Sequence, residues 1–86
     1  MKKIVHGKLY DTETADRLGA WRHQFDTHTL YRTKNGAYFG VTSSENSPLT
    51  DDVFQPLSED EAFEWLVGNG GDELAVELFP DRIEEA

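Results

Sequence analysis

The sequence contains no cysteine and no apolar run approaching the ~20 residues that a membrane-spanning helix needs. Without cysteine, neither disulfides nor thiolate metal ligands can contribute, and small secreted domains usually need such links. The N-terminus also lacks an apolar run of signal-peptide length. These absences predict a cytoplasmic protein that neither crosses nor binds a membrane.

Basic residues are almost absent from the second half of the chain. From Glu45 to Ala86 there are thirteen Asp and Glu and one Arg, a formal charge of −12. The first 44 residues contain seven Lys and Arg against four Asp and Glu, a formal charge of +3. The total of −9 opposes direct binding to nucleic acid or anionic lipid, so the expected macromolecular partner is a basic protein.

No spacing of residues identifies a reaction or a cofactor. The serines of residues 43–47 lack a nucleophile elbow, and His6, His23 and His28 lack zinc-like spacing, so they are expected to be surface or cap residues. The acidic pairs do not match a calcium loop, and residues 68–71 (GNGG) lack the lysine that follows a phosphate-binding loop. We therefore expect a non-enzymatic protein without metal or cofactor.

The chain is long enough for one small folded domain. Its 86 residues include 37% hydrophobic residues, and its ten aromatic residues (five Phe, three Tyr and two Trp) suffice for a single core. We expect one α+β domain over residues 1–86, in which residues 81–86 form a frayed tail or a last turn held by Ile83. The expected order is two β-hairpins with a helix between them, then two short C-terminal helices packed on the sheet.

Two segments have the alternation and the turn residues of β-hairpins. Strands at Lys2–Val5 and Lys8–Tyr10 flank a His-Gly pair. Strands at Thr29–Thr33 and Ala37–Val41 flank the residues Lys-Asn-Gly, in which the Asn-Gly pair favours a type I′ turn. The residues that follow, Thr42–Asp52, have no periodicity and predict either a surface loop or the ragged end of the hairpin.

The segment between the two hairpins has the spacing of an amphipathic helix. Asp11 or Thr12 is a suitable N-cap for a helix that runs to about Trp21. Ala15, Leu18 and Trp21 recur every three residues, which gives this helix one apolar stripe.

The C-terminal third predicts an edge strand and two helices. Val53–Gln55 has the composition of a short edge strand, and Ser58–Glu61 matches a capping box before a helix over Glu59–Val67. A second helix over Asp72–Phe79 ends before Pro80. The residues expected to be buried are Ala62, Phe63 and Leu66 in the first helix and Leu74, Ala75 and Leu78 in the second.

Three segments together resemble a group of small acidic proteins of bacterial phages and integrative elements, mostly without an assigned activity. These are residues 2–15 (KKIVHGKLYDTETA), 30–39 (LYRTKNGAYF) and 56–65 (PLSEDEAFEW). In that group a Gly-rich loop usually follows the second hairpin, whereas residues 41–48 here are VTSSENSP. The resemblance implies a mobile-element origin, and small acidic proteins of such elements include inhibitors of host CRISPR and restriction systems.

The acidic half suggests mimicry of DNA. Glu73 and Glu77 lie four residues apart on the last predicted helix, where like charges destabilise slightly, so stability does not explain them. Their carboxylates, with others, could occupy the basic groove of a nucleic-acid-binding protein, such as a CRISPR effector, and exclude its ligand. The residues predicted to bind the partner are Asp51, Asp52, Glu59, Asp60, Glu64, Glu73 and Glu77.

Three alternatives remain open from the sequence. The carboxylates also fit a solvated acidic face, or a divalent-cation site. The protein could instead be an interaction module that uses aromatic residues of the second hairpin. Alternation places either Tyr31 and Phe39, or Leu30 and Tyr38, in the core and leaves the other pair partly exposed.

Overall fold

The computed structural model of the chain describes residues 2–44 and 52–84. These residues form six strands, two α-helices and one 3-10 turn. The elements are β1 (Lys2–Val5), β2 (Lys8–Asp11), β3 (Asp16–His23), β4 (Asp26–Arg32), β5 (Tyr38–Ser44), β6 (Val53–Leu57), α1 (Glu59–Gly68), α2 (Asp72–Leu78) and η1 (Pro80–Arg82).

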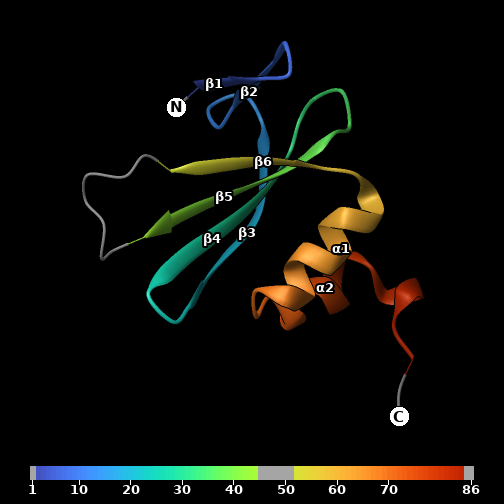
Figure 1. Cartoon of the computed structure of the whole chain (residues 1–86). Helices are drawn as coiled ribbons and strands as arrows, with labels where there is room; N and C mark the ends of the chain where they lie inside the picture. Colours follow the sequence, from blue (N-terminus) through green and yellow to red (C-terminus); the bar gives the residue numbers. More distant parts are fainter. Residues whose placement is uncertain (1, 45–51, 85–86) are drawn as a thin grey trace.

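The strands make two antiparallel sheets, and the fold is α+β as the sequence predicts. β1 and β2 form a separate hairpin, whereas the four-stranded sheet has the order β3-β4-β5-β6. Both helices lie on one side of the four-stranded sheet, and the β1–β2 hairpin lies on the other side (Figure 1). The molecule therefore has three layers, with the four-stranded sheet in the middle.

The segment between the hairpins is a strand, so the predicted helix from Asp11 or Thr12 to Trp21 is wrong. Asp11 ends β2 and caps only a single turn. Its Oδ1 accepts the amide of Glu13 at 2.9 Å, and its carbonyl oxygen accepts the amide of Ala15 at 3.1 Å. The chain then enters β3, which pairs along its length with β4.

A β-bulge explains why the apolar spacing in β3 resembles that of a helix. In a regular strand, Leu18 and Trp21 would point to opposite faces because they are three residues apart. The register shifts between Arg17 and Gly19, and an extra residue in one strand reverses the facing of those beyond it. Leu18 and Trp21 consequently both pack against the core beneath the helices.

The first predicted hairpin is confirmed, and its tight turn is of type I′. Val5 pairs with Lys8, which leaves only His6 and Gly7 between the strands. Their φ angles are 51° and 76°, so both turn residues have the positive φ that defines this turn.

The second predicted hairpin is also confirmed, as β4 and β5, but its turn is not of type I′. The amide of Gly36 donates to the carbonyl oxygen of Thr33 at 2.9 Å, and Gly36 has a φ of 86°. Asn35 lacks the positive φ that type I′ requires. The loop is a wider turn that closes with one left-handed glycine, a pattern that also joins neighbouring strands.

The C-terminal elements follow the sequence closely. β6 is the edge strand predicted at Val53–Gln55, and it continues to Leu57. The capping box is present, because Ser58 Oγ accepts the amide of Glu61 at 3.2 Å and Glu61 Oε1 accepts the amide of Ser58 at 2.9 Å. α1 and α2 both form where they were predicted.

The helices pack closely on the sheet because glycine occupies the points of contact. Leu30, Leu66 and Ala75 are almost fully buried in this core. A Cβ atom added at Gly40 would lie 2.5 Å from the ring of Trp65, so any larger residue would push α1 away from β5. These contacts fix the outer surfaces of both helices relative to the sheet.

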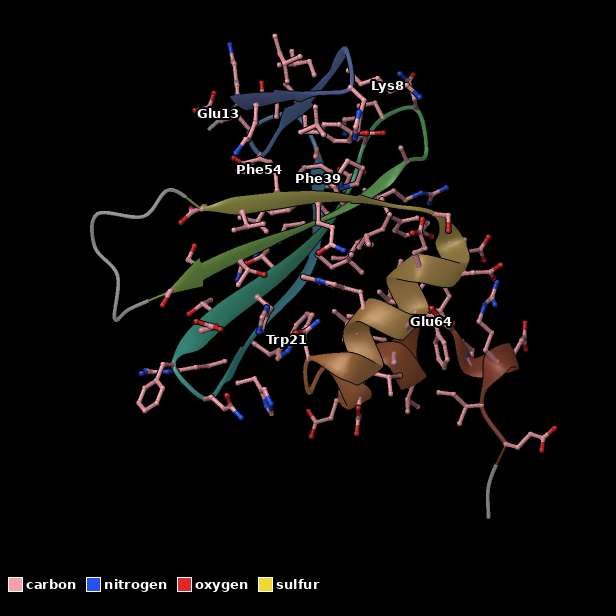
Figure 2. All side chains as sticks on the ribbon, viewed as in Figure 1. Lys8, Glu13, Trp21, Phe39, Phe54 and Glu64 are labelled. Carbon is pink, nitrogen blue, oxygen red and sulfur yellow. The ribbon has the colours of Figure 1, made fainter. Side chains whose placement is uncertain are left out.

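The opposite face of the sheet has its own aromatic core under the β1–β2 hairpin. Phe39 is fully buried, and its ring lies 5.3 Å from that of Tyr10 and 5.9 Å from that of Phe54. Phe39 and Phe54 lie on the side of the sheet that carries this hairpin (Figure 2). The isolated two-stranded sheet is thus held to the larger one through Tyr10.

Both aromatic sets of the second hairpin contact a core, so the predicted division into one core set and one partly exposed set is wrong: Leu30 and Phe39 are buried, and Tyr31 and Tyr38 are half-buried. Leu30 and Tyr38 pack beneath the helices, whereas Tyr31 and Phe39 pack on the other side. The sequence offered one covering layer for this sheet, but the structure has two.

The C-terminal end is an ordered turn as far as Arg82. η1 forms over Pro80–Arg82, and the amide of Ile83 donates to the carbonyl oxygen of Pro80 at 3.3 Å. Phe79, which is buried, anchors this turn, whereas the side chain of Ile83 is exposed. Of the two alternatives expected for residues 81–86, a last turn is present as far as Arg82, but buried Phe79 anchors it instead of Ile83, and residues 85–86 lie outside the described residues.

Candidate functional site

The two helices and the turn after them carry an outer surface of carboxylates. Every acidic residue between Glu59 and Glu84 is exposed, and Arg82 is the one basic residue in that range. We call these nine residues the acidic helical layer. They are Glu59, Asp60, Glu61, Glu64, Asp72, Glu73, Glu77, Asp81 and Glu84.

Packing on the sheet explains why these acidic residues are exposed. Ala62 and Leu66 of α1, and Ala75 of α2, point into the core, which leaves the intervening acidic positions toward solvent. Carboxylates in the first turn of each helix are also favoured by the helix dipole. Glu64 and Glu77 lie beyond the first turn, so the dipole does not account for them.

Five of the seven predicted partner-binding residues lie in this layer. Glu59, Asp60 and Glu64 come from α1, where Figure 2 labels Glu64, and Glu73 and Glu77 come from α2.

The other two predicted residues are not in the layer. Asp51 lies outside the described residues. Asp52 is half-buried and immediately precedes β6, whereas α1 begins after the other end of that strand. Five residues of strand span ~16 Å, so β6 separates Asp52 from the start of the acidic helical layer.

Arg82 neutralises part of the acidic helical layer internally. Its Nη1 lies 2.6 Å from Oδ1 of Asp60, and its Nη2 lies 3.8 Å from Oε1 of Glu59. These two predicted residues are therefore engaged within the molecule. Glu64, Glu73 and Glu77 have no such cation in the described part of the chain.

Four members of the acidic helical layer were not among the residues predicted to bind the partner, namely Glu61, Asp72, Asp81 and Glu84. Glu61 was seen only as a capping-box residue and Asp72 only as the start of a helix. The signal was present, because both belong to the first turn of an exposed helix where acidic side chains are favoured.

An open groove runs between β3 and α2. Its strand side is lined by Leu18, Gly19, Ala20 and Trp21, and its helix side by Gly70, Gly71, Asp72, Glu73, Leu74 and Glu77. Trp21 joins the two sides, since its Nε1 donates to the carbonyl oxygen of Asn69 at 2.7 Å. The groove thus combines an apolar floor with an acidic wall.

Close packing of α2 on β3 sets the shape of this groove. A Cβ atom at Gly19 would lie 2.7 Å from a methyl carbon of Leu74, and one at Gly71 would lie 2.8 Å from the ring of Trp21. The groove could not be predicted from the sequence, because the apolar spacing predicts a helix that runs to about Trp21 in place of β3. Only the tertiary structure brings this strand beside α2.

His28 is buried, which corrects the expectation that all three histidines are surface or cap residues. Its ring lies 5.6 Å from that of Trp21 and 5.7 Å from that of Trp65, and its Nδ1 is 3.1 Å from Oγ1 of Thr42. Burial is the main cause that lowers the pKa of His28 below the ordinary value of 6.5. This histidine is part of the core between β4 and α1, not of an open site.

Within residues 2–44 and 52–84, no cluster of three or more His, Cys, Asp or Glu side chains is arranged to hold a metal ion. In the same ranges, no helix is both long enough and apolar enough to cross a membrane.

Comparison of the chain with known protein families, curated proteins and solved structures finds no match.

Proposed function

We propose that the protein binds a basic, nucleic-acid-binding partner through its acidic helical layer and competes with the nucleic acid for that partner's groove. The observation that carries the proposal is that the residues of α1, α2 and the turn after them, all on one side of the sheet, include nine exposed acidic residues and one arginine. In this role the protein is an inhibitor by DNA mimicry and not an enzyme.

The physical basis of the proposal is long-range electrostatics. Duplex DNA carries one negative charge per roughly 1.7 Å of axis, and neighbouring carboxylates on a helix lie about 5–6 Å apart at Cβ. Residues 59–84 together carry nine negative charges and one positive charge, a net charge of −8. A field of this sign attracts a cationic groove and speeds association at low salt.

The class of partner follows from charge, whereas its identity does not. A CRISPR effector is one such partner, and the resemblance to acidic proteins of phages and integrative elements supports that choice. The carboxylates themselves select for closely spaced Lys and Arg in a groove that normally holds a phosphate backbone.

The rival function, an interaction module built on the second hairpin, has less support, because the half-buried Tyr31 and Tyr38 both contact core residues. Tyr38 lies 6.0 Å from the ring of Phe79, and Tyr31 stacks on Phe39 at 5.0 Å, so these aromatic rings contact the cores.

The proposal is tested by reversing charges within the acidic helical layer and, as a control, at two exposed positions outside it. Glu73→Lys/Glu77→Lys changes the acidic helical layer, whereas Glu13→Lys/Asp16→Lys changes the net charge equally at exposed positions outside it. Both proteins and the wild type are used to capture partners from a lysate of the native host at low and at high salt.

We expect the wild type and the Glu13→Lys/Asp16→Lys variant to capture a basic nucleic-acid-binding protein at low salt and to release it at high salt. We expect Glu73→Lys/Glu77→Lys to capture much less of it. Capture that is equal for all three proteins, or a captured partner that is itself acidic, would contradict the proposal.

A further inference from the structure

The outer edge of β3 is an unpaired strand edge of the four-stranded sheet. Among the described residues, β3 pairs with β4 alone. His23 pairs with Asp26 across a two-residue turn, and hydrogen-bonded and non-hydrogen-bonded pairs alternate along an antiparallel ladder. Counting back from that turn, the amide and carbonyl groups of Ala20 point away from β4, toward the groove.

The two edges of the sheet are unequally protected against strand addition. β6 contains Pro56, which has no amide hydrogen, and proline is one way in which proteins block an edge. β3 has no proline, and its bulge lies before Gly19. The regular edge from Gly19 to His23 is five residues, or ~16 Å, long.

An extended segment in the groove would lie between this edge and α2. Its side chains would alternate between the two faces of the sheet. Those on the helical face would pass Leu18 and Leu74 and end near the carboxylates of Glu73 and Glu77. Side chains with apolar stems and cationic ends, as in Lys and Arg, fit a site that is apolar near β3 and acidic farther out.

A second copy of this chain does not match the groove. Antiparallel pairing of two β3 strands would place both α2 helices on the same face of one continuous sheet. Glu73 and Glu77 of the two copies would then lie on neighbouring helices with like charge. The side chain of Trp21, which faces the helices, offers no cation in exchange.

We propose that the groove between β3 and α2 binds an extended segment of a partner protein, with Lys or Arg at alternate positions, as an added strand on β3. The inference rests on the proposed function for the sign of the partner's charge, and it names the element of the partner that is recognised. Backbone hydrogen bonds to β3 give affinity, and the acidic wall selects the basic side chains.

The probe is a capped peptide of alternating Val and Lys, about six residues long, which matches the length of the regular edge. Its control is an isomer with the same residues in two blocks, first Val and then Lys. Two further peptides carry N-methyl groups, one on the Val amides and the other on the Lys amides. Only one of these two sets of amides faces β3 in an added strand.

Binding is followed by NMR titration of the isotopically labelled protein, and the dissociation constant is measured for each peptide. We expect the amide signals of Gly19 and Ala20 to move and the amide of Ala20 to exchange more slowly. The block isomer and one of the two methylated peptides should bind about tenfold more weakly, whereas the other methylated peptide should bind like the parent.

Glu73→Lys/Glu77→Lys separates this inference from the proposed function. The inference stands if the charge reversal weakens binding of the alternating peptide and if methylation weakens binding in only one of the two methylated peptides. A different result overturns the inference and leaves the proposed function standing: the charge reversal weakens binding of the alternating peptide, while both methylated peptides and the block isomer bind as tightly as the unmethylated alternating peptide. If the alternating peptide does not bind, or if β3 is instead protected in a dimer without peptide, the inference is also overturned. Lysate capture then decides the proposed function separately.

Discussion

The two sides of the four-stranded sheet differ in both covering layer and charge. The helical side is covered by α1 and α2, whose outer surface is acidic, whereas the other side is covered by a small hairpin that contains Lys2, Lys3 and Lys8. The division follows the chain, because residues from the first 44 form β1–β5 and residues after 58 form the helices. An uneven distribution of charge in the sequence thus becomes an uneven distribution in space.

The largest effect on this arrangement is expected from the aromatic core on the hairpin side. Phe39→Ala removes a fully buried ring and should lower the free energy of unfolding by about 4 kcal/mol. Leu9→Ala on the same layer is the control, since Leu9 is 58% exposed and its loss should cost less than about 0.5 kcal/mol. Urea unfolding measures both, and equal effects would contradict the packing described for this side.

A somewhat smaller loss of stability is expected on the helical side of the sheet from Gly40→Ala. The added Cβ would lie 2.5 Å from the ring of Trp65, so α1 must move, and the free energy of unfolding should fall by about 2–3 kcal/mol. Gly68→Ala in α1 is the control, because an added Cβ there meets no atom within 4 Å. It should change stability by less than about 1 kcal/mol. If Gly40→Ala unfolds at the wild-type urea concentration, the close contact of α1 with β5 is wrong.

The cap of α1 should contribute less again. Ser58→Ala removes the hydroxyl that accepts the amide of Glu61, and the free energy of unfolding should fall by about 1 kcal/mol. Ser58→Asp is the matched control, because aspartate also caps a helix and should retain most of the stability. Circular dichroism during thermal unfolding distinguishes them, and an unchanged melting temperature for Ser58→Ala would show that the capping box does not hold this helix.

Acidic pH should destabilise the protein in part through His28. Burial lowers the pKa of His28 in the folded state, so the unfolded state binds the proton more readily. The free energy of unfolding therefore has its full contribution from neutral His28 above about pH 6.5 and declines as the pH falls from there toward the folded-state pKa. Unfolding free energies measured across this range should fall less steeply for His28→Gln than for the wild type. An unchanged slope in His28→Gln would contradict this origin.

The smallest effect on stability is expected from Arg82→Ala, which nevertheless changes charge. Its ion pairs with Asp60 and Glu59 are exposed, so the variant should lose less than about 1 kcal/mol in urea unfolding. The acidic helical layer gains one net negative charge, and association with a basic partner should become faster at low salt. Slower association in Arg82→Ala would indicate that the arginine itself contacts the partner.

The sequence predicts those elements whose signals are local. Both hairpins, β6, α2 and the capping box of α1 form where turn residues, alternation and caps indicated them. The helix predicted to end at Trp21 is wrong because a bulge imitates its spacing, and a bulge depends on pairing with β4. The burial of His28 likewise depends on α1, which supplies Trp65 from far along the chain.

The candidate site likewise has features that local sequence predicts and features that depend on long-range packing. The choice of Glu64, Glu73 and Glu77 needed only charge and helical periodicity, and these residues are exposed on the helices. The ion pairs of Arg82 could not be foreseen, because they depend on how η1 returns to the start of α1. The groove beside β3 also arises from long-range packing, through Gly19 and Leu74.

The most direct measurement of the central claim is the association rate of the captured basic partner as a function of salt. We predict that the rate falls steeply with salt for the wild type and for Glu13→Lys/Asp16→Lys, and that Glu73→Lys/Glu77→Lys is slower at low salt with a flatter dependence. The same steep dependence in all three proteins would contradict the assignment of binding to the acidic helical layer.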